Sequence, residues 1–191
     1  EFIYADTQAA FTSARISLLS SHLLRSPSEM AVRTATSTDE GDRLLIVNDD
    51  DGTIACYTLL RSQKVIAASE WETDGNFLSV GVDTDNIYVV VKRTLPDTSV
   101  NYYVEIFDET LLVDCAKGAA VGSSTNGVSG LSYLEGKTVK VVRDGIVGAD
   151  KTVTSGAITF GRAAEASYQV GLDYTITIKT LPAAPRLQQG S

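Results

Sequence analysis

The central part of the chain alternates short apolar runs with turn residues. Six runs between residues 44 and 107 have the length of a β-strand and are rich in β-branched and aromatic side chains. Pairs such as Asp-Gly and Asp-Asn separate them, as in hairpins. The predicted strands are 44–47, 53–60, 65–72, 77–82, 87–92 and 102–107. We expect an antiparallel meander, either one twisted sheet or, from the strand spacing, propeller-blade-like.

A second β pattern fills residues 130–181. Short runs of Val, Ile and Thr are separated by turns that contain glycine. These turns are Asp144-Gly145, Ser155-Gly156 and Gly171. At residues 174–180 the sequence YTITIKT places Ile176 and Ile178 on one face of a strand, and Thr and Lys on the other. The pattern predicts a compact module of about five strands, a small barrel or sandwich.

The N-terminal region is less regular. Between Thr12 and Arg25 the spacing of Ile16, Leu19 and Leu23 fits one short amphipathic helix, which Pro27 follows. Residues 26–42 are mostly polar and predict a loop, with an additional strand at 29–33.

Glycine and serine concentrate in residues 117–129 and predict a linker. The expected organisation is all-β. Residues 1–116 form an antiparallel meander with a short N-terminal helix, 117–129 a linker, 130–182 a small β module and 183–191 a polar tail.

Composition is that of a globular protein: 43% of the residues are hydrophobic and 21% charged. No apolar run is long enough to span a membrane. The start, EFIYADTQ, lacks the pattern of a signal peptide, and we interpret the chain as a piece of a longer protein. The two cysteines, Cys56 and Cys115, are too few for a disulfide scaffold and predict buried thiols in a protein folded in a cytosol.

The chain is acidic, with a formal net charge of −8. Its 16 basic residues are scattered, whereas phosphate binding needs clustered Lys and Arg. The charge therefore disfavours a nucleic-acid-binding face, and it also keeps a protein surface soluble.

Two short stretches resemble ligand-binding motifs but lack residues that these motifs require. Gly136-Lys137-Thr138 ends like a phosphate-binding loop, but Leu131 stands where the first glycine is needed and a strand-like run follows. The acidic stretch 48–52 misses the EF-hand spacing, because Val47 and Thr58 occupy the first and twelfth positions. It predicts a solvated hairpin tip, with a weak surface calcium site as the alternative.

The known sets of catalytic residues are also incomplete in this sequence. His22 is the only histidine, so no site with two histidines can form within the chain, and we expect a packing or capping role for it. The sequence 127–131 lacks the last glycine of a nucleophile elbow. Paired carboxylates of a glycosidase are identified by geometry and not by spacing. We predict no catalytic, cofactor-binding or metal-binding residues.

Several aromatic residues lie in the strand-like runs: Tyr57, Trp71, Tyr88, Tyr102 and Tyr103. Such residues usually fill a core or stack across strands, and a carbohydrate-binding platform is the alternative.

The order of short motifs along the C-terminal stretch resembles that of the tail tubular protein B, or tail nozzle, family of short-tailed bacteriophages, with its prophage and gene-transfer-agent relatives. The signature residues are Leu134, Glu135, Gly136, Asp144, Gly145, Gly156, Gly171, Leu172 and Tyr174. Shorter similarities upstream extend the resemblance over residues 1–182. Tyr133 and Asp173 depart from the His and Pro that are common in the family at these positions.

This resemblance implies a structural virion protein that is no enzyme. The full-length protein would form a six-fold ring of its own copies, contact other tail proteins and pass DNA without binding it specifically. An acidic wall suits such a conduit, since it repels phosphate. The protein would fold in the bacterial cytoplasm and act in the virion tail. The alternatives are a receptor- or glycan-binding module of a tail and, third, a tail-associated hydrolase.

Overall fold

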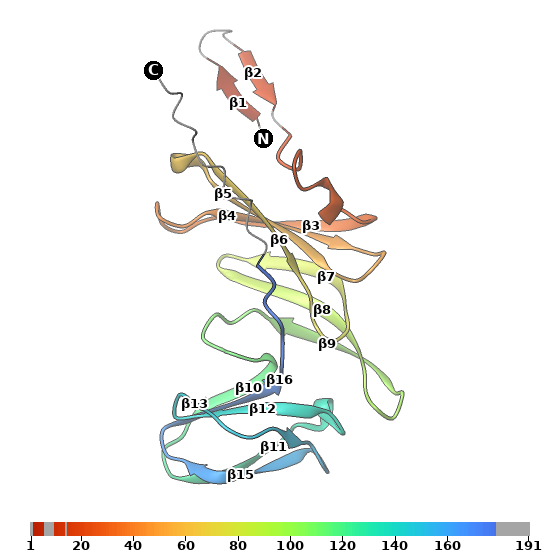
Figure 1. The fold of residues 1–191 in the computed structure, drawn as a ribbon. Helices are drawn as coiled ribbons and strands as arrows, with labels where there is room; N and C mark the ends of the chain where they lie inside the picture. The colour runs from red at the N-terminus through yellow and green to blue at the C-terminus, as the bar shows by residue number, and fades with distance from the viewer. Residues whose placement is uncertain (1, 6–9, 14, 179–191) are drawn as a thin grey trace, which may run out of the picture.

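The computed structural model describes residues 2–5, 10–13 and 15–178 (Figure 1). Strands make up 55% of the described residues, and the helical residues among them form only short 3-10 turns. The prediction of an antiparallel all-β fold is therefore confirmed.

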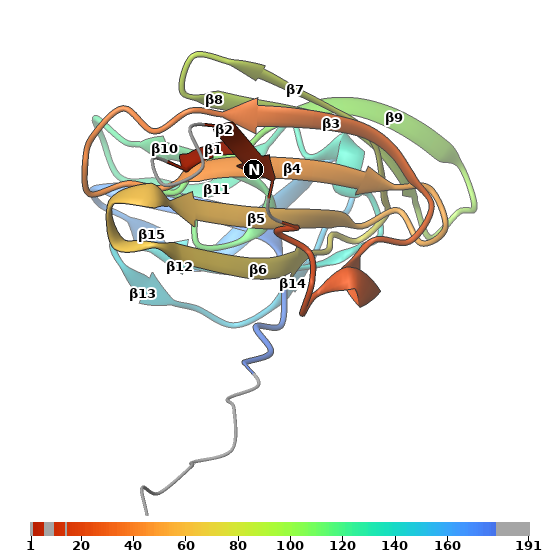
Figure 2. The same cartoon turned by 90° about the horizontal axis from the view of Figure 1, so that it is seen from above.

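The N-terminal half contains a hairpin and two larger antiparallel sheets. The hairpin pairs β1 (Phe2–Ala5) with β2 (Ala10–Ser13). The four-stranded sheet runs in chain order through β3 (Pro27–Arg33), β4 (Asp42–Asn48), β5 (Ile54–Leu60) and β6 (Val65–Trp71), side by side in Figure 2. The three-stranded sheet consists of β7 (Asn76–Asp83), β8 (Asn86–Thr94) and β9 (Val100–Ile106). The six predicted strands of the meander, and the strand expected at 29–33, are all present.

The meander does not continue as one sheet, because the chain turns between β6 and β7. Gly75 lies in this connection with a φ of +145°, and a Cβ there would be 2.3 Å from the carbonyl oxygen of Lys92. The two sheets then pack face to face. Their shared core contains Leu45, Val47, Ile54 and Cys56 from the first sheet and Phe77, Val80, Ile87, Val89 and Val91 from the second. The blade-like interpretation stays a prediction.

The C-terminal module is a small sandwich of two sheets. One sheet has the order β10 (Asp114–Ala120), β16 (Ser167–Leu172), β12 (Thr138–Arg143) and β13 (Ile146–Val147), with β14 (Lys151–Thr152) also paired to β12. The other pairs β11 (Thr125–Ser129) with β15 (Ala157–Ala164) (Figure 1). The core between them contains Val128, Leu131, Leu134, Val139, Val141, Val153, Ile158, Val170 and Leu172.

The predicted linker at 117–129 is wrong, because most of it lies in β10 and β11. Its glycines allow close backbone approach. A Cβ on Gly127 would be 2.5 Å from the carbonyl oxygen of Ile158 on the paired strand, and one on Gly118 would be 2.8 Å from a methyl group of Leu111. The C-terminal module therefore begins before residue 117.

The predicted helix over Thr12–Arg25 is also wrong. The described part of this segment contains the end of β2, a turn and a 3-10 helix of three residues, Ser21–Leu23. Sheet side chains bind its carbonyl groups: the Tyr57 hydroxyl donates to Ser20 and the Asn48 amide to Leu23. The segment covers the outer face of β5 in this way, while Leu19 stays 93% exposed. Two further 3-10 turns are Arg61–Gln63 and Ser132–Leu134.

The strand predicted at 174–180 is not formed over residues 174–178, and residues 179–180 lie outside the described part. β16 ends at Leu172, and no described strand pairs with the residues that follow. Ile176 and Ile178 are therefore exposed despite their strand-like alternation. The predicted polar tail, 183–191, is also outside the described residues.

Candidate interaction surface

One face of the three-stranded sheet is apolar and exposed. On β9 every second residue points outward: Val100, Tyr102, Val104 and Ile106. On β8, Tyr88 is the register partner of Ile106 and is exposed on the same face. These five residues are called the β9 face below. Val104 is 76% exposed and Tyr102 63%, which is unusual for large apolar side chains that are neighbours on a sheet.

The opposite face of β9 is more polar and yet half-buried. Asn101, Tyr103 and Glu105 point toward the rest of the molecule. Glu105 binds Arg93 of β8, and Tyr103 lies against Tyr133 with ring centroids 6.3 Å apart. The polar side of this strand is therefore used inside the molecule, and the apolar side faces outward.

β9 is also an edge strand. The three-stranded sheet ends at β9, and no other described strand pairs with its outer edge. An edge strand carries unpaired N–H and C=O groups that can bind another strand. The β9 face and this edge together could contact a protein partner through apolar side chains and backbone hydrogen bonds.

A buried ionic cluster connects the two halves of the molecule. The Arg93 side chain is 3% exposed and donates two hydrogen bonds to Glu105, at 2.7 and 2.6 Å, and one to the carbonyl of Asp74 at 2.8 Å. Burial acts to lower the pKa of Arg93, but the hydrogen bonds and charge of Glu105 outweigh it and raise the pKa. Asp114, which begins β10, lies 3.8 Å from the same guanidinium group and accepts a hydrogen bond from Thr73 at 2.7 Å.

Two more contacts cross this junction. Lys137 Nζ lies 2.7 Å from Asp74 Oδ2, and Gly136 adopts a φ of +74° beside Pro96, where a Cβ would be 3.2 Å from the proline ring. The meander and the C-terminal module therefore share a packed junction of charged and aromatic side chains.

The cysteines are free thiols in the structure. Cys56 is buried in the core of the meander, and Cys115 is partly buried at the junction. Burial raises the pKa of Cys115 to about 12, so this thiol is protonated at neutral pH and is a poor nucleophile. Burial also raises the pKa of Tyr133 beside it to about 12.

Most signature residues shape the C-terminal module. Leu134 and Leu172 are in its core. Glu135 accepts hydrogen bonds from the backbone N–H groups of Ser155, at 2.8 Å, and Gly156, at 2.6 Å. Its carboxylate thereby fixes the turn before β15 to the turn before β12. Gly171 lies where β16 meets β10, and a Cβ there would be 2.4 Å from the carbonyl oxygen of Asp114.

The Asp144-Gly145 turn joins β12 to β13. Both residues have positive φ, +51° and +76°, as a type I′ hairpin turn requires. The Asp144 carboxylate accepts hydrogen bonds from the backbone N–H groups of Glu165, Ala166 and Ser167, which lower its pKa. Tyr174, the last signature residue, is exposed beyond β16.

The predicted hairpin tip at 48–52 is only partly solvated. Asp49 and Asp50 are exposed, but Asn48 is fully buried and its side chain binds Leu23, Arg25 and Thr53. Asp51 binds Thr53 and forms an ion pair with Arg25. The loop fixes the N-terminal segment to the sheet.

His22 is exposed in the last turn of its 3-10 helix, so the predicted packing role is wrong, and the capping role stays a prediction. Among the described residues, no group of three His, Cys, Asp or Glu side chains is placed to hold a metal ion. No helix within the described residues is long and apolar enough to cross a membrane.

The aromatic residues divide into two groups. Tyr57 is fully buried, and Tyr103 contacts Tyr133. Trp71 packs against Phe107 with ring centroids 4.7 Å apart. These three residues are placed as expected for core and cross-strand positions. Tyr88 and Tyr102 are instead exposed on the β9 face. Sequence reasoning missed this face, although the alternation along residues 100–106 contains it.

Comparison with known proteins adds no assignment. No family model matches the chain, and no curated protein is significantly similar to it.

Proposed function

We propose that the chain is a non-catalytic structural component of a short-tailed phage or prophage tail. In this proposal it associates with copies of itself, and with other tail proteins, through the β9 face. The observation that carries the proposal is this exposed row of Val, Tyr and Ile side chains on an edge strand. A solvent-exposed apolar strand at a sheet edge is costly in a protein that works alone, because it promotes association.

Two further features support a tail component. The order of the signature residues along the chain resembles that of the tail nozzle family, and most of these residues lie in the turns and core of one module. The net charge of −8 also suits a wall along which DNA passes without being bound. A six-fold ring in the virion tail, formed after folding in the bacterial cytoplasm, is the assembly that the resemblance implies.

Electron microscopy of the concentrated protein tests this assembly. We expect annular particles with a central hole wide enough for a DNA duplex, and their loss in Val104→Glu, which places a charge in the β9 face. Compact particles without a hole would contradict the conduit.

A glycan-binding module is the second candidate, because Tyr88 and Tyr102 are exposed on one sheet face and aromatic rings stack on sugars. Saturable binding of host glycans that Tyr102→Ala removes would favour this function over the structural one. Tyr57→Phe, a change in the core, is the matched aromatic control and should leave glycan binding unchanged.

A further inference from the structure

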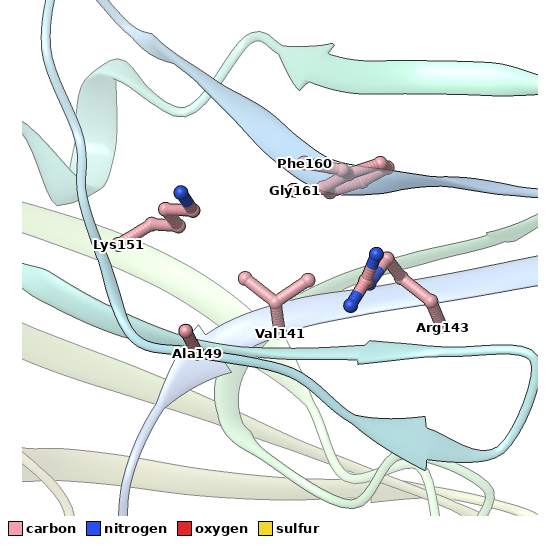
Figure 3. Close-up of a pocket in the computed structure, with 6 residues that line it drawn as sticks. All are labelled: Val141, Arg143, Ala149, Lys151, Phe160 and Gly161. Carbon is pink, nitrogen blue, oxygen red and sulfur yellow. The ribbon is translucent and has the colours of Figure 1, made fainter.

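A small pocket opens on the C-terminal module, and no residue of the β9 face lines it (Figure 3). Its volume is about 90 Å³. β12 contributes Val141 and Arg143, and Lys151 comes from β14. The remaining lining residues are Ala149, Phe160 and Gly161. In Figure 3 the Lys151 ammonium group and the Arg143 guanidinium group lie on opposite sides of the pocket, with Val141 between them.

Neither cation of this pocket has a carboxylate partner among the described residues. Arg143 donates one hydrogen bond, from Nη1 to the carbonyl oxygen of Arg162 at 2.5 Å, and this bond fixes the guanidinium group. The Lys151 side chain makes no hydrogen bond or ion pair with the described part of the chain. Both side chains are only partly exposed.

The acidic residues nearby bind other groups. Asp150 forms an ion pair with Lys140 at 3.0 Å, and Asp144 accepts the three backbone N–H groups and binds Arg162 at 3.2 Å. The two cations therefore lack a local counter-charge in a chain that has 24 acidic residues and only 16 basic ones. The buried Arg93 and the partly buried Lys137 and Lys140, by contrast, each have a carboxylate partner.

We propose that this pocket binds a small inorganic oxyanion of the phosphate or sulfate class. Arg offers planar paired donors to such an oxyanion and Lys a mobile point charge. The apolar walls, Val141 and Phe160, reduce the local dielectric and strengthen both attractions. The volume is well below the roughly 300 Å³ at which sites for drug-sized ligands begin, so the occupant is a single small ion. This proposal is independent of the proposed structural function.

NMR titration of the isotope-labelled chain with sodium phosphate, at constant ionic strength, tests the site. We expect saturable shifts of the backbone amides of Arg143, Lys151 and Gly161, with little change elsewhere. Lys151→Gln should weaken phosphate binding by roughly tenfold, and Lys151→Arg should retain it. Lys92→Gln, a partly exposed lysine on β8, is the matched control and should bind as the wild type does.

The proposal would be overturned by amide chemical-shift changes that grow linearly with the phosphate concentration or that are scattered over the chain. Equal phosphate binding by the wild type and Lys151→Gln would also overturn it. The spectrum of each variant reports directly whether it is folded. Binding of phosphate is measured without any assembly assay, so failure here is distinct from failure of the structural function.

Discussion

Asp144 shows how one residue can organise two turns of this fold. Its backbone supplies the first central position of the type I′ turn, and its carboxylate binds the backbone of the turn between β15 and β16. Because three N–H groups bind the ionised form, the folded pKa is below the ordinary value. Ionisation of Asp144 therefore stabilises the folded state.

Asp144→Asn should lower the melting temperature at neutral pH. The wild-type advantage is fully present above the ordinary pKa of 3.8 and disappears as the pH falls through the lower folded value. Thermal melts of both proteins from pH 7 to pH 2 measure this difference, which should shrink on acidification. Asp49→Asn changes an exposed carboxylate that binds no other side chain among the described residues, and it should differ little from the wild type at any pH. A difference in melting temperature between Asp144→Asn and the wild type that stays the same at every pH would contradict this role.

Glu105→Gln should destabilise the protein strongly, because the buried Arg93 guanidinium loses the carboxylate that is hydrogen-bonded to it and keeps only Asp114, at 3.8 Å. Loss of one partner from a buried ion pair costs about 3–5 kcal/mol. Urea unfolding measures this loss. Glu109→Gln is the matched control: it breaks an exposed ion pair with Arg43 and should cost less than about 1 kcal/mol. Equal effects of the two substitutions would show that the buried pair is not important for stability.

Strands that form local hairpins could be predicted from the sequence pattern. Features of a strand that depend on a residue far along the chain could not. The strands between residues 44 and 107 follow from alternation and turn residues alone. The orientation of β9 does not, because Glu105 on its polar side is drawn inward by Arg93. Residues 174–178 have an equally good strand pattern but no described neighbour to pair with.

The glycines of residues 117–129 led to the wrong prediction of a linker. In residues 117–129 glycine suggested flexibility, whereas Gly118 and Gly127 lie in paired strands where neighbouring atoms come close. A single sequence does not distinguish these two uses of glycine, since the distinction depends on a strand some 30 or more residues away. The turn glycines Gly145 and Gly156 were predictable, because their positive φ is a local requirement.

Hydrogen exchange distinguishes a linker from paired strands at residues 117–129. We expect amides of β10 and β11 to be protected as strongly as those of β16, since their backbone hydrogen bonds open only with the module. The exposed residues 174–178 in the same protein are the internal control and should exchange rapidly. Rapid exchange of the amides throughout residues 117–129 would support a linker there and contradict the paired strands.

Gly171→Ala should weaken the pairing of β10 with β16. The new methyl group would be 2.4 Å from the Asp114 carbonyl oxygen, and overpacking of this kind costs about 1–3 kcal/mol. Gly161→Ala, on β15, is the control and should be near neutral, because its new methyl group would have no atom within 4 Å beyond its chain neighbours. Chemical unfolding curves for both variants provide the comparison, and equal stability would contradict the close approach.

At the scale of the whole molecule, two β sandwiches meet at the Arg93 cluster and leave one apolar sheet face exposed. The junction uses the polar side of β9, and the apolar side is exposed. The alternation along residues 100–106 separates the two faces of β9, but which face is exposed depends on how the two modules pack, and so does the junction. The proposed assembly rests on this arrangement.

Sedimentation velocity over a wide concentration range tests whether the chain associates through the β9 face. The wild type should associate increasingly as its concentration rises. Val104→Glu should weaken this association by at least about tenfold, or roughly 1.4 kcal/mol, and leave stability within about 0.5 kcal/mol of the wild type. Val147→Glu places the same charge at a 68% exposed position on β13 and should associate as the wild type does. A wild type that stays monomeric throughout, or a Val104→Glu variant that associates equally well, would contradict association through the β9 face.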